Sequence, residues 1–141
     1  YVCCGHPFPN VFTFSPPAEG AFIGWYTMAA GLDGFLRWAY NSWVKEPLLD
    51  SRFRTWPAGD TFIVYPDARS SIRFERLKEG IQDAEKIRIL REEFEKNPSP
   101  EAKEKLNLLN QTVDLFNITG NPENLEELMQ KGKEVLESLS K

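Results

Sequence analysis

The sequence predicts an α/β fold in which about three short buried strands alternate with helices and a helical extension follows. Three observations lead to this prediction. Short apolar runs, bounded by glycine or proline, occur at residues 1–4, 34–39 and 61–65. Their nearly continuous apolar character is typical of strands that are covered on both faces, as in a parallel sheet. From Ser71 onward the apolar residues recur instead with the period of an α-helix.

The first strand, residues 1–4, ends at a stretch rich in proline and glycine, residues 5–10. A helix is expected over residues 18–32, with Gly31 near its end. Its apolar stripe comprises Phe22, Trp25, Tyr26 and Ala29. We expect this stripe to pack on the predicted sheet.

The second and third strands, residues 34–39 and 61–65, are separated by a polar loop that contains Arg52, Arg54 and Trp56. Connections of about twenty residues inside a compact domain tend to be functional, so we expect a functional role for this loop. Pro66 ends the third strand.

A long amphipathic helix of about 25 residues is predicted after Ser71. Its apolar face comprises Phe74, Leu77, Ile81, Ala84, Ile87, Leu90 and Phe94. Gly80 interrupts the helix. Because glycine costs about 1 kcal/mol relative to alanine inside a helix, we expect another part of the protein to approach closely there.

Two further helices should complete the chain, one from Ser99 and Pro100 to about residue 117 and one that follows the break at residues 120–122 and runs to residue 140. We therefore divide the chain into two parts. Residues 1–96 form the α/β part, and residues 97–141 form a helical extension.

The bulk composition limits the function classes. The chain has 141 residues, which suffice for one domain but not for a closed eight-stranded α/β barrel of about 250 residues. If the chain is barrel material, its length therefore makes it a piece of a longer protein, and we expect the start at Tyr1 to be a processing boundary. The net charge of -4, without a dense basic patch, disfavours a nucleic-acid partner. No apolar stretch is long enough to predict a membrane span.

The sequence predicts neither a metal nor a cofactor. Cys3, Cys4 and His6 offer too few side chains for a Cys/His zinc site. The adjacent cysteines are interpreted as buried free thiols, with a strained vicinal disulfide as the alternative.

An aromatic and polar cluster marks the end of the second strand. It comprises Trp38, Tyr40, Asn41 and Trp43. Aromatic rings stack on the apolar face of a sugar, and an amide offers both a donor and an acceptor to hydroxyl groups. The cluster therefore predicts a carbohydrate-binding site, with ordinary core packing as the alternative.

Four further residues are candidates for supporting this site. Asp60 and Tyr65 flank the third strand, and Arg73 and Asp83 lie on the long helix. They could hold the cleft in place. The alternative is a structural ion-pair network that joins the helix to the sheet.

Three motifs resemble, in order and in spacing, the C-terminal part of proteins of glycoside hydrolase family 123. They are Gly34-Phe-Leu-Arg-Trp-Ala-Tyr-Asn-Ser-Trp43, Gly59-Asp60 with Val64-Tyr65-Pro66, and the segment from Ser71 to Glu85. The resemblance covers about residues 1–92. It implies that Trp38, Asn41 and Trp43 line the cleft and that Arg73 and Asp83 support it. Family members often carry Asp-Tyr-Glu where this chain has Asp83-Ala84-Glu85.

The resemblance implies the C-terminal part of a (β/α)₈ TIM-type barrel that hydrolyses β-linked 2-acetamido sugars such as N-acetylgalactosamine. In that mechanism the acetamido oxygen of the substrate is the nucleophile, and an adjacent Asp-Glu pair orients it and protonates the leaving group. The sequence contains no Asp-Glu dipeptide. We therefore expect the pair upstream of Tyr1 and no glycosidase activity from this chain alone. The resemblance also implies an extracytoplasmic location.

The expected partners follow from this interpretation. They are a carbohydrate substrate and, at the open edge of the sheet, either a second copy of the chain or the missing barrel portion. Two other functions remain open. One is a non-catalytic carbohydrate-binding or scaffold domain, and the other is an interaction module formed by residues 99–141.

Overall fold

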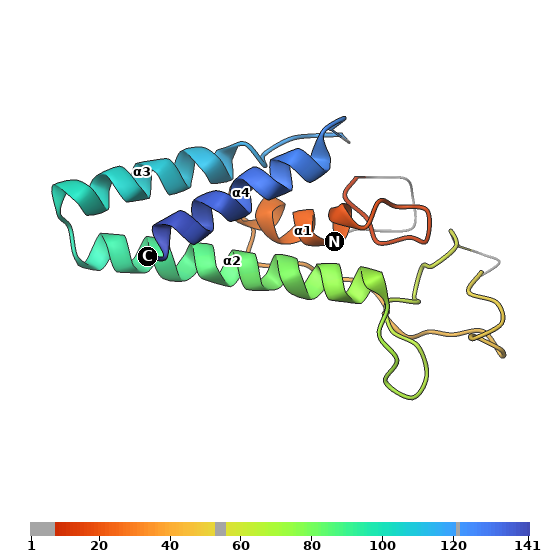
Figure 1. The fold of residues 1–141 in the computed structure, drawn as a ribbon. Coiled ribbons are helices and arrows are strands. Elements are labelled where there is room, and N and C mark those ends of the chain that lie inside the picture. The colour runs from red at the N-terminus through yellow and green to blue at the C-terminus, as the bar shows by residue number, and fades with distance from the viewer. Residues whose placement is uncertain (1–7, 53–55, 121) are drawn as a thin grey trace.

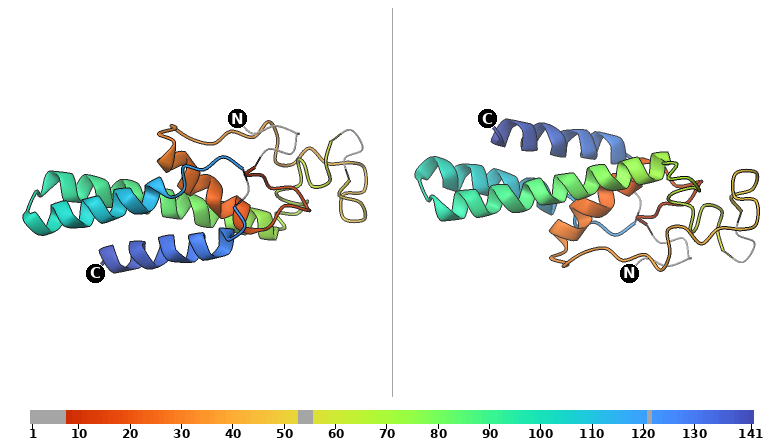
Figure 2. Two further views of the ribbon diagram at one scale, coloured as in Figure 1. Left: turned by 90° about the horizontal axis from the view of Figure 1, so that it is seen from above. Right: turned by 90° about the horizontal axis from the view of Figure 1, so that it is seen from below.

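A computed structural model of the chain describes residues 8–52, 56–120 and 122–141. These residues contain four helices and no strand. The helices are α1 (Ala18–Ala29), α2 (Ile72–Lys96), α3 (Pro100–Asp114) and α4 (Leu125–Leu139). In Figure 1, α2 and α3 form an antiparallel hairpin and α4 lies beside it. The long loops gather at the end of the molecule where α2 begins (Figures 1 and 2).

The predicted α/β fold is wrong for the described residues. Residues 34–39 and 61–65 are irregular loops rather than strands, so the structure contains no portion of a TIM-type barrel in the ranges it describes. The remaining predicted strand, residues 1–4, lies outside the described residues. Tyr65 and Arg69 form an isolated bridge within one turn.

Local backbone geometry explains why residues 61–65 do not form a strand. Thr61 has a φ of 67°, in the left-handed region that a strand cannot use. The N–H groups of Ile63 and Val64 both donate to the carbonyl of Tyr40, at 3.1 and 3.4 Å. In a β-sheet, the backbone groups of one strand hydrogen-bond to a succession of different residues on the neighbouring strand. Here two consecutive N–H groups share one carbonyl, so they do not form a sheet pairing. The apolar run instead reflects burial, because Phe62 and Ile63 are both buried.

The helices follow the sequence closely. The Ser71 hydroxyl accepts a hydrogen bond from the backbone N–H of Phe74 at 3.2 Å and caps α2. The Ser99 hydroxyl caps α3 in the same way, with Pro100 at the first helical position. These predicted helix starts are confirmed. α1 ends at Ala29, earlier than predicted.

α1 and α2 cross in direct backbone contact. A Cβ atom added to Gly24 would lie 1.9 Å from the carbonyl oxygen of Gly80, and one added to Gly80 would lie 2.4 Å from that of Ala21. No side chain fits at either glycine, so the close approach expected at Gly80 is confirmed.

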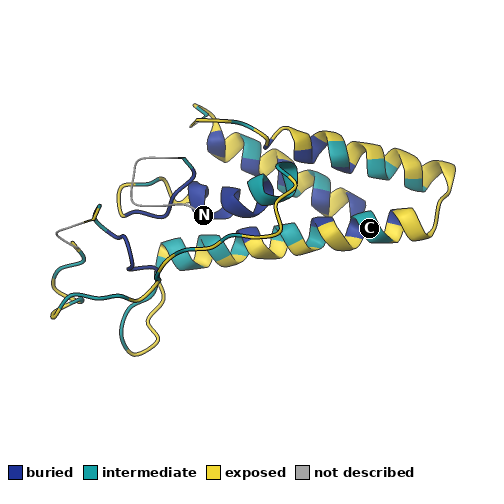
Figure 3. Cartoon of the chain, turned by 180° about the vertical axis from the view of Figure 1, so that it is seen from behind, coloured by how far each residue is buried: buried dark blue, intermediate teal, exposed yellow. Residues whose placement is uncertain are grey.

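The main core lies between the helices (Figure 3). The Trp25 and Phe116 rings stack with centroids 4.2 Å apart. Gly132 of α4 leaves room for them, since a Cβ there would lie 2.8 Å from the Trp25 ring. The aromatic stripe of α1 therefore packs on helices rather than on the expected sheet. The main core contains residues from both sides of residue 96. The division of the chain into residues 1–96 and 97–141 stays a prediction.

A smaller apolar cluster attaches the loops to the helices. Its buried members are Val11, Ile23 and Ile63. Phe35 and Leu77 pack against them. Each long loop segment thus places an apolar side chain against α1 or α2.

The outer face of α2 carries ion pairs about one turn apart. Arg88 pairs with Glu85 and Glu92, and Lys96 pairs with Glu92. Such exposed pairs stabilise a helix locally. In the part of the chain that the structure describes, none of the helices is both long and apolar enough to span a bilayer.

We predict that Gly24→Ala lowers the free energy of unfolding of the 141-residue chain by about 3 kcal/mol, because the new methyl group overlaps the α2 backbone. Gly34→Ala is the matched control, since a Cβ at Gly34 meets no atom within 4 Å. Urea unfolding measures both. Equal stability of the two variants would contradict the backbone contact.

Candidate functional site

The loop that contains Thr13 and the loop that contains Gly59 are in direct backbone contact. Gly59 has a φ of 85°, and a Cβ there would lie 2.6 Å from the backbone nitrogen of Thr13. The Thr13 N–H donates to the carbonyl of Ala58 at 2.9 Å. These contacts fix the loop around Thr13 against the loop that carries Asp60.

A buried ion pair between Arg37 and Asp60 lies at the centre of the loops. Their side chains are 5% and 0% exposed. The other terminal nitrogen of Arg37, Nη1, donates to Asn10 Oδ1 at 2.8 Å, and the guanidinium lies over the Phe12 ring, 5.1 Å from its centroid. Buried charges are tolerated when they are paired and hydrogen-bonded. Both terminal nitrogens of Arg37 meet this condition, whereas its buried Nε has no hydrogen-bond partner among the described residues.

The polar network continues into α1. The Asn10 N–H donates to Glu19 Oε2 at 2.8 Å, and Glu19 is buried in the first turn of α1. Burial raises the pKa of Glu19, and the hydrogen bond from Asn10 partly opposes that increase. Hydrogen bonds thus connect the start of α1 to Arg37 and Asp60.

Trp38 contacts this ion pair. Its indole Nε1 donates to Asp60 Oδ2 at 3.4 Å, and 42% of the residue is exposed. The Trp56 ring meets it edge to face, with centroids 6.3 Å apart and an interplanar angle of 63°. Trp38 and Trp56, which we call the aromatic platform, therefore present ring surface to solvent while a buried charge holds one indole.

The other residues of the predicted site differ in exposure. Tyr40 and Asn41 are exposed, and the Tyr40 carbonyl accepts the bonds from residues 63 and 64. Trp43 is half-buried, and its Nε1 donates to the Val64 carbonyl at 2.8 Å. The Trp43 indole thus connects two loops through its nitrogen.

Two of the predicted supporting residues meet at the start of α2. Arg73 Nη2 donates to the Phe62 carbonyl at 2.7 Å and to the Tyr65 hydroxyl at 3.4 Å. Because the first of these bonds holds the backbone of Phe62, it also holds the loop that follows Asp60. The structure thus brings Arg73 and Tyr65 together.

Asp83 lies elsewhere, about 15 Å further along the axis of α2 than Arg73. Its Oδ2 accepts a hydrogen bond from Trp25 Nε1 at 2.9 Å and so connects α2 to α1. Burial raises the pKa of Asp83, opposed by the Trp25 hydrogen bond and by the positive charges of Lys86 and Arg76.

Sequence reasoning missed Arg37 and Asn10. An arginine inside the apolar run of residues 34–39 was a usable signal, because a charge in such a run needs a partner when the run is buried. Among the described residues, no group of three or more His, Cys, Asp and Glu is placed to hold a metal ion. Cys3, Cys4, His6 and Arg54 lie outside those residues.

The sequence profile of the catalytic domain of glycoside hydrolase 123 matches residues 1–90. The chain belongs to glycoside hydrolase family 123. The resemblance inferred from the three motifs is thereby confirmed. Among curated proteins, no sequence matches this family 123 chain.

A solved structure supports the same assignment. It is a family 123 glycoside hydrolase from Clostridium perfringens, studied for the details of glycolipid glycan hydrolysis. The two proteins share 29% sequence identity with a TM-score of 0.71. The match covers 97% of this family 123 chain, so it extends beyond residue 96, but only 26% of the clostridial chain.

We predict that Arg37→Met lowers the free energy of unfolding by about 3–5 kcal/mol, because it leaves Asp60 buried without its charge partner. Arg52→Met is the control. Arg52 pairs with Asp50, but its side chain is 77% exposed, so its loss should leave the stability nearly unchanged. Chemical denaturation measures both, and similar losses would contradict a special role for the buried pair.

We predict a pH-dependent effect for Asp83→Asn. Because the pKa of Asp83 is raised in the folded state, folding is coupled to proton uptake. The wild-type chain should therefore lose stability relative to this variant as the pH rises from about 4 through the raised pKa. Urea unfolding across this range tests the sign.

Glu85→Gln should show the opposite sign in the same pH series. The hydrogen bond from Arg88 lowers the pKa of Glu85, so the folded state binds a proton less readily there. The wild-type chain should gain stability relative to Glu85→Gln as the pH rises from below the lowered pKa through the usual range of a glutamate. A common sign for both variants would contradict the assigned environments.

Proposed function

We propose that this chain is the C-terminal part of a family 123 glycosidase that acts on β-linked 2-acetamido sugars, and that it supplies sugar-contacting surface rather than the catalytic acid. One observation carries the proposal. The aromatic platform presents ring surface to solvent, and its Trp38 indole Nε1 lies 3.4 Å from the buried Asp60 carboxylate, in a stretch that matches a glycosidase catalytic domain.

The platform suits a sugar ring for physical reasons. Indole faces stack on the apolar C–H face of a pyranose, and the exposed Tyr40 and Asn41 offer a hydroxyl and an amide in the same loop. Because Asp60 already holds the Trp38 indole, less side-chain freedom is lost when a ligand binds.

Family membership supports the substrate class. The clostridial relative is described for glycolipid glycan hydrolysis, and we extend that class, the glycan of a glycolipid, to this protein. In the proposed reaction the acetamido oxygen bonds to the anomeric carbon as the glycosidic bond breaks and a carboxylic acid protonates the leaving oxygen. Water then opens the cyclic intermediate.

The carboxylates for this chemistry would come from outside the chain. The sequence contains no Asp-Glu dipeptide, which is the acid pair expected for this mechanism. The same observation favours a second candidate, a carbohydrate-binding or scaffold part without catalysis of its own. The two candidates differ in whether the complete enzyme turns over.

We predict that Trp38→Ala, made in the complete enzyme, lowers kcat/KM for a chromogenic β-N-acetylgalactosaminide about tenfold, equivalent to roughly 1.4 kcal/mol, mostly through KM. Trp56→Ala should act in the same direction. Leu49→Ala is the control, because Leu49 is an exposed apolar residue of the same loop region outside the platform.

The outcomes separate the alternatives. Unchanged kcat/KM in both tryptophan variants would contradict a platform role. Sugar binding by the wild-type complete enzyme without turnover, with quenched tryptophan fluorescence that Trp38→Ala abolishes, would favour the non-catalytic alternative.

A further inference from the structure

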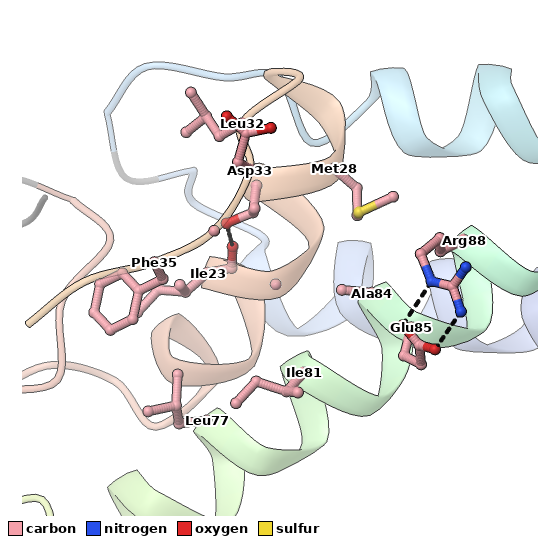
Figure 4. Close-up of a pocket in the computed structure, with 13 residues that line it drawn as sticks. Ile23, Met28, Leu32, Asp33, Phe35, Leu77, Ile81, Ala84, Glu85 and Arg88 are labelled. Atoms are coloured by element: carbon pink, nitrogen blue, oxygen red, sulfur yellow. Dashed lines mark hydrogen bonds and ion pairs between the residues drawn. The ribbon is translucent and has the colours of Figure 1, made fainter.

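An apolar groove of about 470 Å³ lies between α1, α2 and the segment that follows α1. Its apolar lining includes Ile23, Met28, Leu32, Phe35, Leu77 and Ile81. Figure 4 shows Leu77 and Ile81 rising from α2 toward Ile23 and Phe35. The groove is thus formed by side chains from three separate segments.

The groove continues the smaller apolar cluster rather than the main core. Leu77 packs against that cluster, and Ile81, one turn further along the same face of α2, lines the groove. Ile81 is nevertheless 59% exposed, and Leu32, across the groove, is 51% exposed. Large apolar side chains that line one concave surface mark a site of interaction when they are left exposed. The described residues cover Leu77 but leave Ile81 open.

The polar rim is compatible with burial of the groove. Glu85 and Arg88 line one end and pair with each other at 2.6 Å (Figure 4). Covering the groove therefore does not leave either charge without a partner.

The length of the solved relative indicates the occupant. The match uses 97% of this chain but only 26% of the clostridial chain, so about three quarters of that protein lies outside it. Residues 1–90 match a catalytic domain, and both helices that form the groove begin within this range. We propose that the groove is an internal docking surface that receives an apolar segment from the remainder of the same catalytic domain. This inference rests on family membership and not on the proposed substrate.

The test compares two isoleucines of α2 in the complete natural chain. Ile81 lines the groove, whereas Ile89 lies outside its lining and is 49% exposed in this structure. In Ile81→Cys the new thiol should react with a maleimide about tenfold more slowly than the one in Ile89→Cys. The wild-type chain gives the background from Cys3 and Cys4.

A second pair of variants measures stability. Ile81→Asp should lower the Tm of the complete chain by about 4 °C or more, and Ile89→Asp by much less. If Ile81→Asp does not fold, Ile81→Ala against Ile89→Ala gives the same comparison with a smaller expected difference.

The results distinguish the occupants. Slow labelling at residue 81 in a chain that light scattering shows to be monomeric supports the proposal. Equal labelling rates overturn it. Protection that appears only at concentrations where the chain dimerises also overturns it and assigns the groove to a second copy. Neither readout requires turnover, so failure here leaves the proposed glycosidase function untouched.

Discussion

The contact between the α1 and α2 backbones at Gly24 and Gly80 positions most of the other features. It holds the two helices so close together that no residue larger than glycine fits at either position. With α1 in place, Trp25 reaches both Phe116 in the main core and Asp83 on α2. The first turn of α1 then presents Glu19 to Asn10, which starts the polar network of the loops.

The loops are held by side chains rather than by secondary structure. Asp60 uses one carboxylate oxygen for Arg37 and the other for Trp38, so one buried group both neutralises a charge and orients an exposed ring. Arg73 and Ser71, at the start of α2, bond the carbonyls of Phe62 and Ile63. This arrangement keeps a surface without strands in a defined shape, which a binding platform requires.

The sequence allowed the helices and the family to be predicted, because both depend on local signals. Serine caps, proline at a first helical position and apolar residues at helical spacing are read directly from neighbouring residues. The strands were predicted wrongly because an apolar run reports burial and not backbone geometry. Thr61 shows the difference, since it is buried but has a positive φ.

The centre of the site was harder to predict than its surface. Aromatic residues are conspicuous in a sequence, and Trp38, Tyr40 and Asn41 are indeed exposed. Asp60 is among the predicted supporting residues, but its partner Arg37 lies 23 residues away along the chain, and nothing in the local pattern identifies that pairing. Asp83, which is predicted as a supporting residue, lies about 15 Å along α2 from Arg73 and accepts a hydrogen bond from Trp25 of α1. A single long helix can therefore carry predicted site residues into different surroundings.

The ion pairs along the outer face of α2 have a consequence for the order of folding. Glu85, Arg88, Glu92 and Lys96 interact within about one turn, so they favour helix before any tertiary partner is present. The α2–α3 hairpin also closes over a short turn. In several places the hydrogen bonds of the loop network instead join residues that are 23 or more positions apart in the chain. The chain between them must lose conformational entropy before these bonds can form. A newly made chain should therefore be largely helical before its aromatic platform acquires a fixed shape.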